Sequence, residues 1–162
     1  MTSPLYAPPV VLPRLNARPD AEVTVRRARV GDVPRLYEII NYYASRGDML
    51  PKTLDQLYNR VRAFKVAEAD GEVVGCAALH ITWADLAEVV SLAVHPDFQG
   101  RGLGREVIRR LVARAAGHKK IILYANPGTE GFYAGRGFRR MRTAMAIWDD
   151  TQQAVAKGLL EG

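Results

Sequence analysis

Apolar and polar positions alternate along several short stretches of this chain, the pattern of strands that bury one face. Two of these stretches flank Asp70 and Gly71, a dipeptide typical of a two-residue hairpin turn. A second turn is expected near Ala84 and Asp85. The predicted strands cover residues 23–28 (VTVRRA), 63–69 and 72–83 on either side of the first turn, 86–94 (LAEVVSLAV), 119–125 (KKIILYA) and 138–148 (FRRMRTAMAIW).

Apolar residues at helical spacing predict helices between the strands. The first helix is expected to be capped by Asp32 and to end near Gly47. The second begins with a capping box formed by Thr53 and Gln56, and the third ends at Gly117. A short fourth helix is expected at TEGFYAGRG (129–137). The apolar faces are expected to carry Val33, Leu36, Ile40 and Tyr43 in the first helix, Leu54, Leu57 and Val61 in the second, and Leu103, Val107, Leu111 and Ala115 in the third.

The order of these elements, βααβββαβαβ, places a helical crossover between two strands of the sheet. Such a connection joins parallel neighbours, so we expect a mixed sheet with helices on both faces. The fold class is α/β, with about six or seven strands flanked by about four helices. The expected organisation is a Pro-rich, extended and weakly ordered tail (1–21), one domain (22–150), and a C-terminal tail (151–162) with a short helix packed through Val155, Leu159 and Leu160.

Composition is typical of an ordinary globular protein of the cytoplasm, with 48% hydrophobic and 25% charged residues in a chain of 162. The single cysteine, Cys76, excludes an intrachain disulfide framework and fits a reducing compartment. No stretch approaches the roughly 18 consecutive apolar residues of a membrane span, and the N-terminus lacks a basic secretory region. The net charge of +6 favours an anionic partner, without choosing among nucleic acid, a phosphorylated cofactor and an acidic substrate.

The stretch HPDFQGRGLGREVI (95–108) places glycines at positions 100, 102 and 104, directly before a predicted helix. Glycine costs backbone entropy, so three of them at a helix entrance indicate a role other than stability. Backbone N–H groups that no side chain shields suit close approach to an anion. Two known phosphate loops do not fit. No G-x-x-x-x-G-K-[ST] occurs, and the dinucleotide pattern G-x-G-x-x-G fails in its third glycine and lacks an acidic residue about 20 positions further on.

Gln99, Gly102 and Gly104 instead form the pattern Q-x-x-G-x-G between a strand and a helix. This stretch resembles the acyl-CoA pyrophosphate loop of the GNAT superfamily of N-acetyltransferases, and GFYAGRGF (131–138) resembles the later helix and final strand of that family. The resemblance extends over roughly residues 23–148 and implies a single-domain GNAT fold with acetyl-CoA as co-substrate. The residues that it assigns to acetyl-CoA are Leu92, Ala93, Val94, Gln99, Gly100, Arg101, Gly102, Leu103, Gly104, Arg105, Asn126 and Tyr133.

Acyl transfer from a thioester to an amine needs a base for the ammonium proton, a donor for the carbonyl oxygen and an acid for the thiolate. Glu88 lies on an otherwise apolar strand face, where a carboxylate suits a base; a structural ion pair is the alternative. The resemblance assigns the base to Glu88, the acid to Tyr133 and the oxyanion donor to the backbone N–H of Leu92. A core tyrosine with a satisfied hydroxyl is the alternative for Tyr133. The resemblance also implies that the strand of Glu88 separates from the next one, and that Asn126 lies toward the CoA sulfur.

His80 is expected directly opposite Glu88 if the second turn centres on Ala84, where it would either assist Glu88 or serve in packing alone. His95 is expected to shape the loop that follows it. Cys76 is interpreted as a core residue. Cys76 and His80 are four residues apart on one strand, about 13 Å, so no metal site is expected.

The sequence leaves the acceptor amine open. The segment YYASRGDMLPKTLDQLY (42–58), with ADLAEVVSLAVHP (84–96), resembles the short bacterial N-acetylglutamate synthases of the same superfamily. Candidates for binding a carboxylated substrate are Arg46, Lys52, Arg62 and His80. Those relatives tend to carry a basic residue where Val90 stands, and the end of the domain is more like general small-amine members.

We therefore expect an enzyme that transfers an acetyl group from acetyl-CoA to a primary amine by direct attack in a ternary complex. The expected acceptor is a small molecule such as an amino acid, L-glutamate included. A protein lysine or N-terminal amine is the alternative acceptor, and a non-catalytic module that binds CoA or nucleic acid is the alternative of another class. Glu88 and Tyr133 together favour the enzyme. No membrane partner is expected, nucleic acid is disfavoured, and a homodimer stays open.

Overall fold

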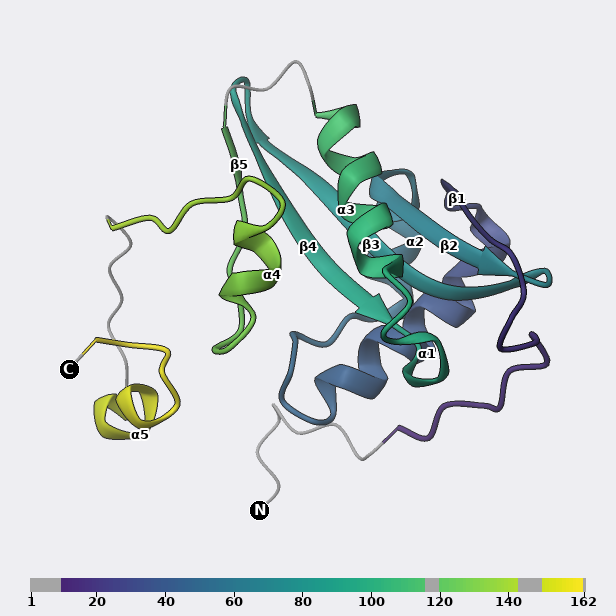
Figure 1. Ribbon diagram of the computed structural model, residues 1–162, viewed down its shortest axis with the longest axis horizontal. Helices are drawn as coiled ribbons and strands as arrows, with labels where there is room; N and C mark the ends of the chain where they lie inside the picture. Colours follow the sequence, from purple (N-terminus) through teal and green to yellow (C-terminus); the bar gives the residue numbers. More distant parts are fainter. Residues whose placement is uncertain (1–9, 116–119, 143–149, 162) are drawn as a thin grey trace. The chain divides into compact units, whose positions relative to one another are not determined.

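A five-stranded sheet forms the centre of the larger part of the chain, which ends at residue 123 (Figure 1). The computed structural model describes residues 10–115, 120–142 and 150–161. Two compact units divide the chain, one ending at residue 123 and the other beginning at residue 124. The sheet belongs to the first unit. Its strands are β1 (Val23–Arg27), β2 (Phe64–Ala69), β3 (Glu72–Trp83), β4 (Leu86–Val94) and β5 (Lys120–Ile122).

The strands lie in the order β1-β2-β3-β4-β5. Neighbours are antiparallel apart from β4 and β5, which run parallel. The helix α3 (Leu103–Arg114) joins this parallel pair, so the predicted mixed sheet with a helical crossover is confirmed. Five strands are described, fewer than the sequence predicts, because the last predicted strand falls mostly outside the described residues.

Helices cover both faces of the sheet, as predicted. In Figure 1, α3 lies in front of the sheet, while α1 (Val33–Ala44) and α2 (Leu54–Arg60) lie behind it. The middle strand β3 is buried at seven successive positions, because both of its faces are covered. The remaining helices are the single 3-10 turns η1 (Val30–Asp32), η2 (Val61–Ala63) and η3 (Pro96–Phe98) in the first unit, and α4 (Glu130–Ala134) and α5 (Thr151–Ala156) in the second.

The larger core lies between the sheet and the pair α1 and α2. Leu36 and Ile40, which the helical period assigns to the apolar face, are fully buried there together with Ile39. Each such side chain contributes about 1.5–3 kcal/mol through burial. On the opposite face α3 buries Leu103, Val107, Ile108 and Leu111. These two apolar interfaces fix both helix layers on the strands that carry the site.

The two predicted caps have different outcomes. Thr53 and Gln56 form the capping box of α2, with backbone-to-side-chain distances of 3.0 and 3.1 Å. Asp32 precedes α1 but does not cap it, so that prediction is wrong. Its carboxylate instead accepts hydrogen bonds from the Arg26 guanidinium at 2.8 and 2.9 Å and from the Arg29 backbone at 2.6 Å. Burial raises the pKa of Asp32, and these hydrogen bonds outweigh burial and lower it.

The two predicted turns, between β2 and β3 and between β3 and β4, are both present. Asp70 and Gly71 have φ angles of 48° and 77°, the left-handed pair that a two-residue hairpin turn requires. His80 pairs with Glu88 across β3 and β4, which confirms the predicted register at that position. Further along, the register shifts by one residue, and Ser91 adopts a φ of 56°. This β-bulge was not predicted, because serine gives no sequence signal for a positive φ.

Residues 10–22 contain no regular element and lie along the first unit. The backbone N–H of Ala17 donates to Glu72 Oε1 at 2.6 Å, and that of Arg18 donates to Asp70 Oδ2 at 2.8 Å. The side chain of Arg101 reaches back to the Ala21 carbonyl at 3.0 Å. These bonds attach the described part of the Pro-rich tail to the hairpin and to the loop after β4.

The second unit confirms the two short helices predicted there, as α4 and α5. The expected packing of the last helix is wrong: Val155 and Leu159 are 37% and 44% exposed, while the small Ala154 is buried. Residues 138–142 form no strand. The rest of the predicted last strand (143–149) and Gly117 lie outside the described residues. No helix in the described part of the chain is long and apolar enough to cross a membrane.

Candidate active site

β4 carries Glu88 and Leu92, two of the three predicted catalytic residues. Its neighbour β5 pairs with it over three residues. β5 pairs with Leu86, Ala87 and Glu88. Beyond Glu88 no described strand pairs with that edge of β4. The two parallel strands therefore part at Glu88, as the family resemblance implies. An opening between strands at this point leaves backbone groups available to an extended ligand.

Glu88 is half-buried where the strands part. Among the described residues its carboxylate makes no hydrogen bond or ion pair, and its electrostatic partner is His80. The alternative role for Glu88 is a structural ion pair at the strand end. No described residue forms such an ion pair with it. A half-buried carboxylate without a fixed partner is suited to accept a proton from a substrate.

His80 lies beside Glu88 on the α2 face of the sheet, but its ring contacts a different residue. Nη1 of Arg60, on α2, lies within hydrogen-bond distance of Nε2 of His80 and 3.5 Å from Nδ1. Burial and the Arg60 charge lower the pKa of His80, and Lys52 acts in the same direction, against Glu88. His80 is therefore neutral near pH 7, and its influence on Glu88 is electrostatic.

Arg60 is the residue of this face that the sequence reading missed. It follows the buried Leu57 by three residues, so the helical period could have placed it toward the sheet. With Lys52 it brings two cations to His80, beside a single carboxylate. We call Lys52, Arg60, His80 and Glu88 the acceptor-face cluster. Its excess of positive charge would be relieved by an anionic group.

The bulge in β4 lies at the predicted oxyanion donor. Ser91 and Leu92 together face the single residue Ala77 of β3. A bulge leaves its extra residue out of the ladder and re-aims the backbone, a device common next to active sites. The Cys76 thiol donates to the Ser91 carbonyl at 3.5 Å, which holds the bulge from the core side. The N–H of Leu92 therefore belongs to irregular backbone, the setting that an oxyanion donor requires.

Cys76 itself is a core residue. It is fully buried, and burial raises the pKa of its thiol to about 12, so it is not a nucleophile near neutral pH. No group of three or more His, Cys, Asp or Glu side chains in the described part of the chain could hold a metal ion.

The glycine loop opens α3 through main-chain geometry. Gly100 and Gly102 have φ angles of 78° and 74°, in the left-handed region that favours glycine. Gly102 is the N-cap of α3 and offers no side chain to the first turn. The first helical hydrogen bond runs from Glu106 N to Gly102 O at 3.1 Å, so the N–H groups of the three residues between them have no partner within the helix. A bare helix N-terminus of this kind is suited to binding an anion.

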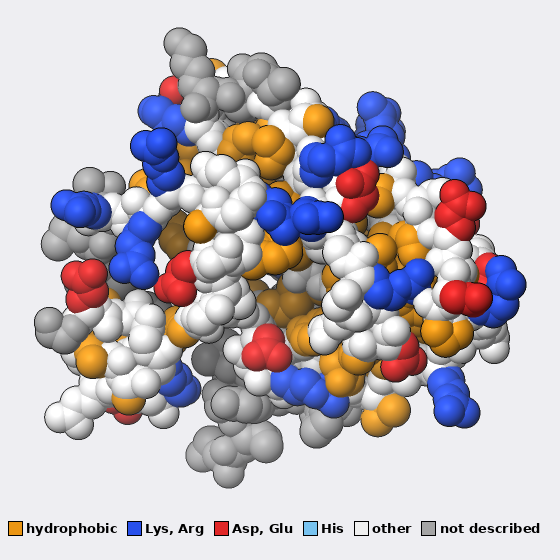
Figure 2. All heavy atoms as spheres, in the orientation of Figure 1, with side chains coloured by type: hydrophobic (Ala, Val, Ile, Leu, Met, Phe, Trp, Pro, Cys, Tyr) orange, Lys and Arg blue, Asp and Glu red, His pale blue; other side chains and the backbone are white. Residues whose placement is uncertain are grey.

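The arginines of this region differ in what they can offer such an anion. Figure 2 shows Lys and Arg side chains gathered over α3. Arg101 is turned away to the Ala21 carbonyl and lies over the Phe98 ring at 4.9 Å. Glu106 holds Arg109 and Arg110, and these hydrogen bonds lower the pKa of Glu106 to about 2. Arg105, in the first turn, is exposed and has no side-chain partner among the described residues.

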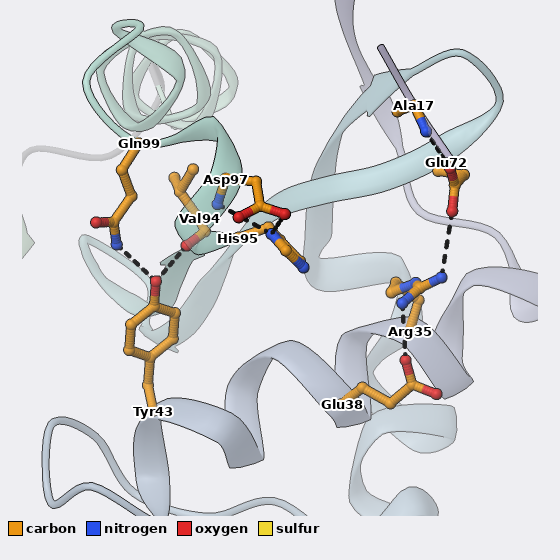
Figure 3. A network of polar contacts seen from close by, with 9 residues as sticks. All are labelled: Ala17, Arg35, Glu38, Tyr43, Glu72, Val94, His95, Asp97 and Gln99. Atoms are coloured by element: carbon orange, nitrogen blue, oxygen red, sulfur yellow. Dashed lines mark hydrogen bonds and ion pairs between the residues drawn. The ribbon is translucent and has the colours of Figure 1, made fainter. Parts of the chain in front are cut away.

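Gln99 at the start of the loop is tied to α1 rather than pointing freely to solvent (Figure 3). Its side-chain amide donates to the Tyr43 hydroxyl at 2.6 Å, and that hydroxyl donates to the Val94 carbonyl. One lone pair of Val94 is thus occupied, although the sequence reading expected the backbone of residues 92–94 to be free. Tyr43 was predicted only as an apolar-face residue, and nothing in the sequence indicates its bond to a residue 56 positions away.

His95 shapes the loop, as expected. It is 4% exposed, and its Nδ1 accepts the backbone N–H of Asp97 at 3.1 Å, which caps η3. Burial lowers the pKa of His95 and outweighs the opposing effect of Asp97. The ring is therefore neutral near pH 7 and acts as a fixed hydrogen-bond acceptor.

The segment between α1 and α2 places its cations differently. Arg46 lies over the Tyr42 ring at 3.6 Å. The backbone of Lys52 is held on both sides by the buried Asn41, at 2.9 and 3.2 Å, which fixes its side chain near His80. Arg62 is joined through its carbonyl to Arg114 of α3 at 3.0 Å. The structure thus brings Lys52 to the acceptor-face cluster, and it shows no contact of Arg46 or Arg62 with His80.

Tyr133 and Asn126 belong to the second unit. Tyr133 contacts the rings of Phe132 and Phe138 edge-on at centroid distances of 5.0 and 6.0 Å. Burial raises its pKa, and its hydroxyl makes no hydrogen bond with the described residues. The alternative for Tyr133, a core tyrosine with a satisfied hydroxyl, requires a hydrogen-bond partner for that hydroxyl. No described residue provides one. Asn126 begins the turn before α4 and accepts the backbone N–H of Thr129 at 3.0 Å.

Comparison with known proteins identifies the family of this chain. The model of the acetyltransferase (GNAT) family matches residues 33–138, most of the chain. The protein belongs to the GNAT family of acetyltransferases and is an N-acetyltransferase enzyme.

The proteins similar to this chain include an amino-acid acetyltransferase and an N-acetylglutamate synthase. An amino-acid acetyltransferase of Mycobacterium tuberculosis is 38% identical over 154 residues, which cover 91% of this chain and 88% of the relative. A crystal structure of a Mycobacterium tuberculosis protein with CoA and a second ligand has a TM-score of 0.69 at 33% identity, over 84% of this chain and 89% of that one. The N-acetylglutamate synthase of Neisseria gonorrhoeae, solved with coenzyme A and N-acetyl-glutamate, has a TM-score of 0.67 at 31% identity. This chain covers 29% of that synthase, and the match includes 74% of this chain.

Proposed function

We propose that the enzyme transfers the acetyl group of acetyl-CoA to the amino group of a small carboxylated amine, an amino acid with L-glutamate as the first candidate. The observation that carries this proposal is the acceptor-face cluster, in which Arg60 and Lys52 bring positive charge to His80, the residue that pairs with Glu88 across β3 and β4. An amino acid presents the complementary pair of groups, an ammonium for Glu88 and a carboxylate for the cations. The amino-acid acetyltransferase among the relatives supports the same acceptor class.

The bare N-terminus of α3 fits the pyrophosphate of coenzyme A. Leu103, Gly104 and Arg105 supply N–H groups there, and the helix dipole adds partial positive charge. The exposed Arg105 guanidinium is available to a phosphate oxygen. The relatives solved with CoA support this assignment. When bound, acetyl-CoA supplies an activated thioester carbonyl.

Each remaining task of the reaction has a candidate in the chain. Glu88 accepts the proton of the acceptor ammonium, and the freed amine nitrogen forms a bond to the carbonyl carbon. The Leu92 N–H donates to the carbonyl oxygen as negative charge develops on it. As the carbon–sulfur bond breaks, Tyr133 gives its hydroxyl proton to the thiolate, the nitrogen releases its surplus proton to solvent to become the amide, and Tyr133 regains a proton from solvent. Because burial raises the pKa of Tyr133, the hydroxyl is protonated at neutral pH.

Within the class of amino acids, Val90 bears on whether L-glutamate is the acceptor. Val90 is partly buried and packs against the core on the α1 face, so it places no charge where glutamate-acetylating relatives tend to carry one. The second carboxylate of glutamate would then also have to be bound by Arg60 or Lys52. Amino acids with one carboxylate make no such demand.

An acceptor panel tests the proposal. Thiol release from acetyl-CoA is measured with the free amino acids, simple amines without a carboxylate, and a lysine peptide, and each product is identified by mass. We expect the highest kcat/KM among the amino acids. A lysine peptide that exceeds every amino acid overturns the acceptor, and CoA binding without turnover on any amine overturns the enzyme in favour of a CoA-binding module.

Arg60→Met tests the cluster directly. Loss of a charge-assisted contact to the acceptor carboxylate should raise the KM for the best amino acid by about tenfold or more and leave the KM for acetyl-CoA unchanged. Arg27→Met removes the same charge from an exposed position on β1 and is the matched control. Equal effects of the two substitutions would show that net charge alone matters.

A further inference from the structure

We infer that Tyr43 is a positioning residue that couples the acetyl-CoA loop to the segment that binds the acceptor, so that each substrate strengthens binding of the other. This inference rests on the proposed function, because it concerns the two substrates of that same site. Tyr43 is the last aromatic residue of α1 and directly precedes the α1–α2 segment (Figure 3).

The side chain of Tyr43 joins the end of β4 to the start of the glycine loop. Its hydroxyl donates its one proton to the carbonyl of Val94, the last residue of β4, and accepts a hydrogen bond from the amide of Gln99, the first residue of the Q-x-x-G-x-G pattern. Figure 3 shows the two bonds meeting at the hydroxyl, with Gln99 and Val94 coming from opposite sides. Burial raises the pKa of Tyr43, which keeps this proton in place well above neutral pH.

The backbone of Tyr43 holds the other segment. Its carbonyl accepts the backbone N–H groups of both Arg46 and Asp48 at 3.1 Å, so the first turn after α1 is fixed to this residue. Its ring meets Tyr42 edge-on at 5.0 Å, and Tyr42 in turn carries the Arg46 guanidinium on its face. The α1–α2 segment is therefore bonded to the backbone of Tyr43, and the start of the loop is bonded to its side chain.

Coupling follows from this shared anchor. A pyrophosphate bound at the loop restrains Gln99, which restrains Tyr43 and the turn that leads to Lys52. Restraint that is already present lowers the entropy cost of binding the second ligand. By thermodynamic reciprocity, the acceptor must then tighten acetyl-CoA by the same factor. Among the described residues, the tyrosine hydroxyl is the hydrogen-bonded link between α1 and the start of the loop.

The experiment measures binding and two-substrate kinetics of wild type, Tyr43→Phe, Gln99→Ala and the double variant. Tyr43→Phe should weaken CoA by about fivefold in calorimetry, the range of a lost hydrogen bond. Gln99→Ala should also weaken CoA, and the double variant should be no weaker than Tyr43→Phe, because Tyr43→Phe already removes the bond that Gln99→Ala breaks. In wild type the acceptor KM should fall as acetyl-CoA approaches saturation, and in Tyr43→Phe it should become independent of acetyl-CoA.

Tyr42→Phe is the matched control, since it removes a neighbouring hydroxyl that makes no hydrogen bond with the described residues and keeps the ring under Arg46. It should bind CoA as wild type does. Unchanged CoA affinity in Tyr43→Phe, or additive losses in the double variant, would overturn the inference. Gln99 is exposed, so Gln99→Ala tests the same bond even if the α1 variant fails to fold. A wild-type protein that does not bind CoA at all would overturn the proposed function instead.

Discussion

The glycine loop and the acceptor-face cluster lie toward opposite ends of β4 and are built by opposite means. The loop uses the main chain: Gly100 and Gly102 take left-handed backbone angles, and the first turn of α3 offers its N–H groups without a capping side chain. The acceptor-face cluster uses side chains from the segment before α2, from α2, from β3 and from β4, and its neutral histidine depends on a neighbouring arginine.

Under the proposed function, this difference makes the loop a general site for acetyl-CoA and the cluster a selective site for the acceptor. Backbone N–H groups at a helix N-terminus bind a phosphate whatever the acyl acceptor is, so their geometry requires only glycine at a few positions. Charged side chains on separate elements can be exchanged one at a time, which changes the acceptor and leaves the loop intact. Of the variants that follow, Glu88→Gln is expected to affect the acceptor-face cluster and Gly102→Val the glycine loop.

The largest expected effect belongs to Tyr133, the proposed proton donor in the second unit. Tyr133→Phe should lower kcat by roughly 10- to 1000-fold, because the thiolate would leave without a proton, while CoA binding changes little. Steady-state kinetics and calorimetry measure the two quantities. Tyr124→Phe, at a 79% exposed tyrosine of the same unit, is the control. Full kcat in Tyr133→Phe would leave that tyrosine a purely structural residue.

Glu88→Gln tests the acceptor side of the comparison. The variant should keep its fold and its CoA affinity and lose about two orders of magnitude in kcat/KM near neutral pH, since no base remains for the ammonium. Part of the loss should be recovered at high pH, where the amine is already free. The measurement is a pH–rate profile of kcat/KM for the best acceptor. A profile that matches wild type would remove Glu88 from the role of base.

Gly102→Val tests the loop. A Cβ at this position meets no atom within 4 Å, so the effect arises from the left-handed φ of 74° and from shielding of the N–H groups. CoA binding should weaken at least about tenfold, or about 1.4 kcal/mol. Gly71→Val is the matched control, because Gly71 has a φ of 77° in a hairpin turn and also has open space around it. If a folded Gly102→Val binds CoA normally, the pyrophosphate site lies elsewhere.

The smallest expected effect is on stability, through the histidine that frames the loop. Burial lowers the pKa of His95 below the value of about 6.5 that it has in the unfolded chain. The unfolded state therefore takes up a proton first, so this contribution to stability is complete above about pH 6.5 and is lost as the pH falls below that value. His95→Asn keeps an acceptor for the Asp97 N–H but cannot titrate, so its stability should fall less between about pH 7 and about pH 5.

Thermal denaturation across that pH range measures the difference. His80, whose pKa is also lowered, is present in both proteins. It contributes to the pH dependence of stability that remains in His95→Asn. Identical pH dependence in wild type and His95→Asn would mean that His95 does not stay neutral in the folded protein.

The sequence predicted the parts of the site that depend on neighbours along the chain. The bounds of β4 and the pairing of His80 with Glu88 follow from alternation and from one tight turn. The loop follows from three glycines at a strand–helix junction. These features are local, so periodicity and glycine spacing suffice to place them.

The remaining parts depend on tertiary contacts that no local pattern records. Asp32 was expected to cap α1, but the Arg26 guanidinium on β1 offers it two charge-assisted hydrogen bonds instead. Ser91 carries a positive φ because the β3–β4 register must absorb one extra residue. Arg60 meets His80, and Tyr43 meets Gln99, across separations of 20 and 56 residues. Side-chain partners at such separations become visible only in the folded chain.

The most direct test of the account is a full two-substrate kinetic comparison of Gly102→Val with Arg60→Met. Initial rates are measured over a grid of acetyl-CoA and amino-acid concentrations, so that a KM for each substrate is obtained at saturation of the other. The account predicts that Gly102→Val raises the KM for acetyl-CoA by at least about tenfold with the acceptor KM near wild type, and that Arg60→Met does the reverse. Arg60→Met raising both constants equally, or Gly102→Val altering the acceptor KM alone, would contradict it.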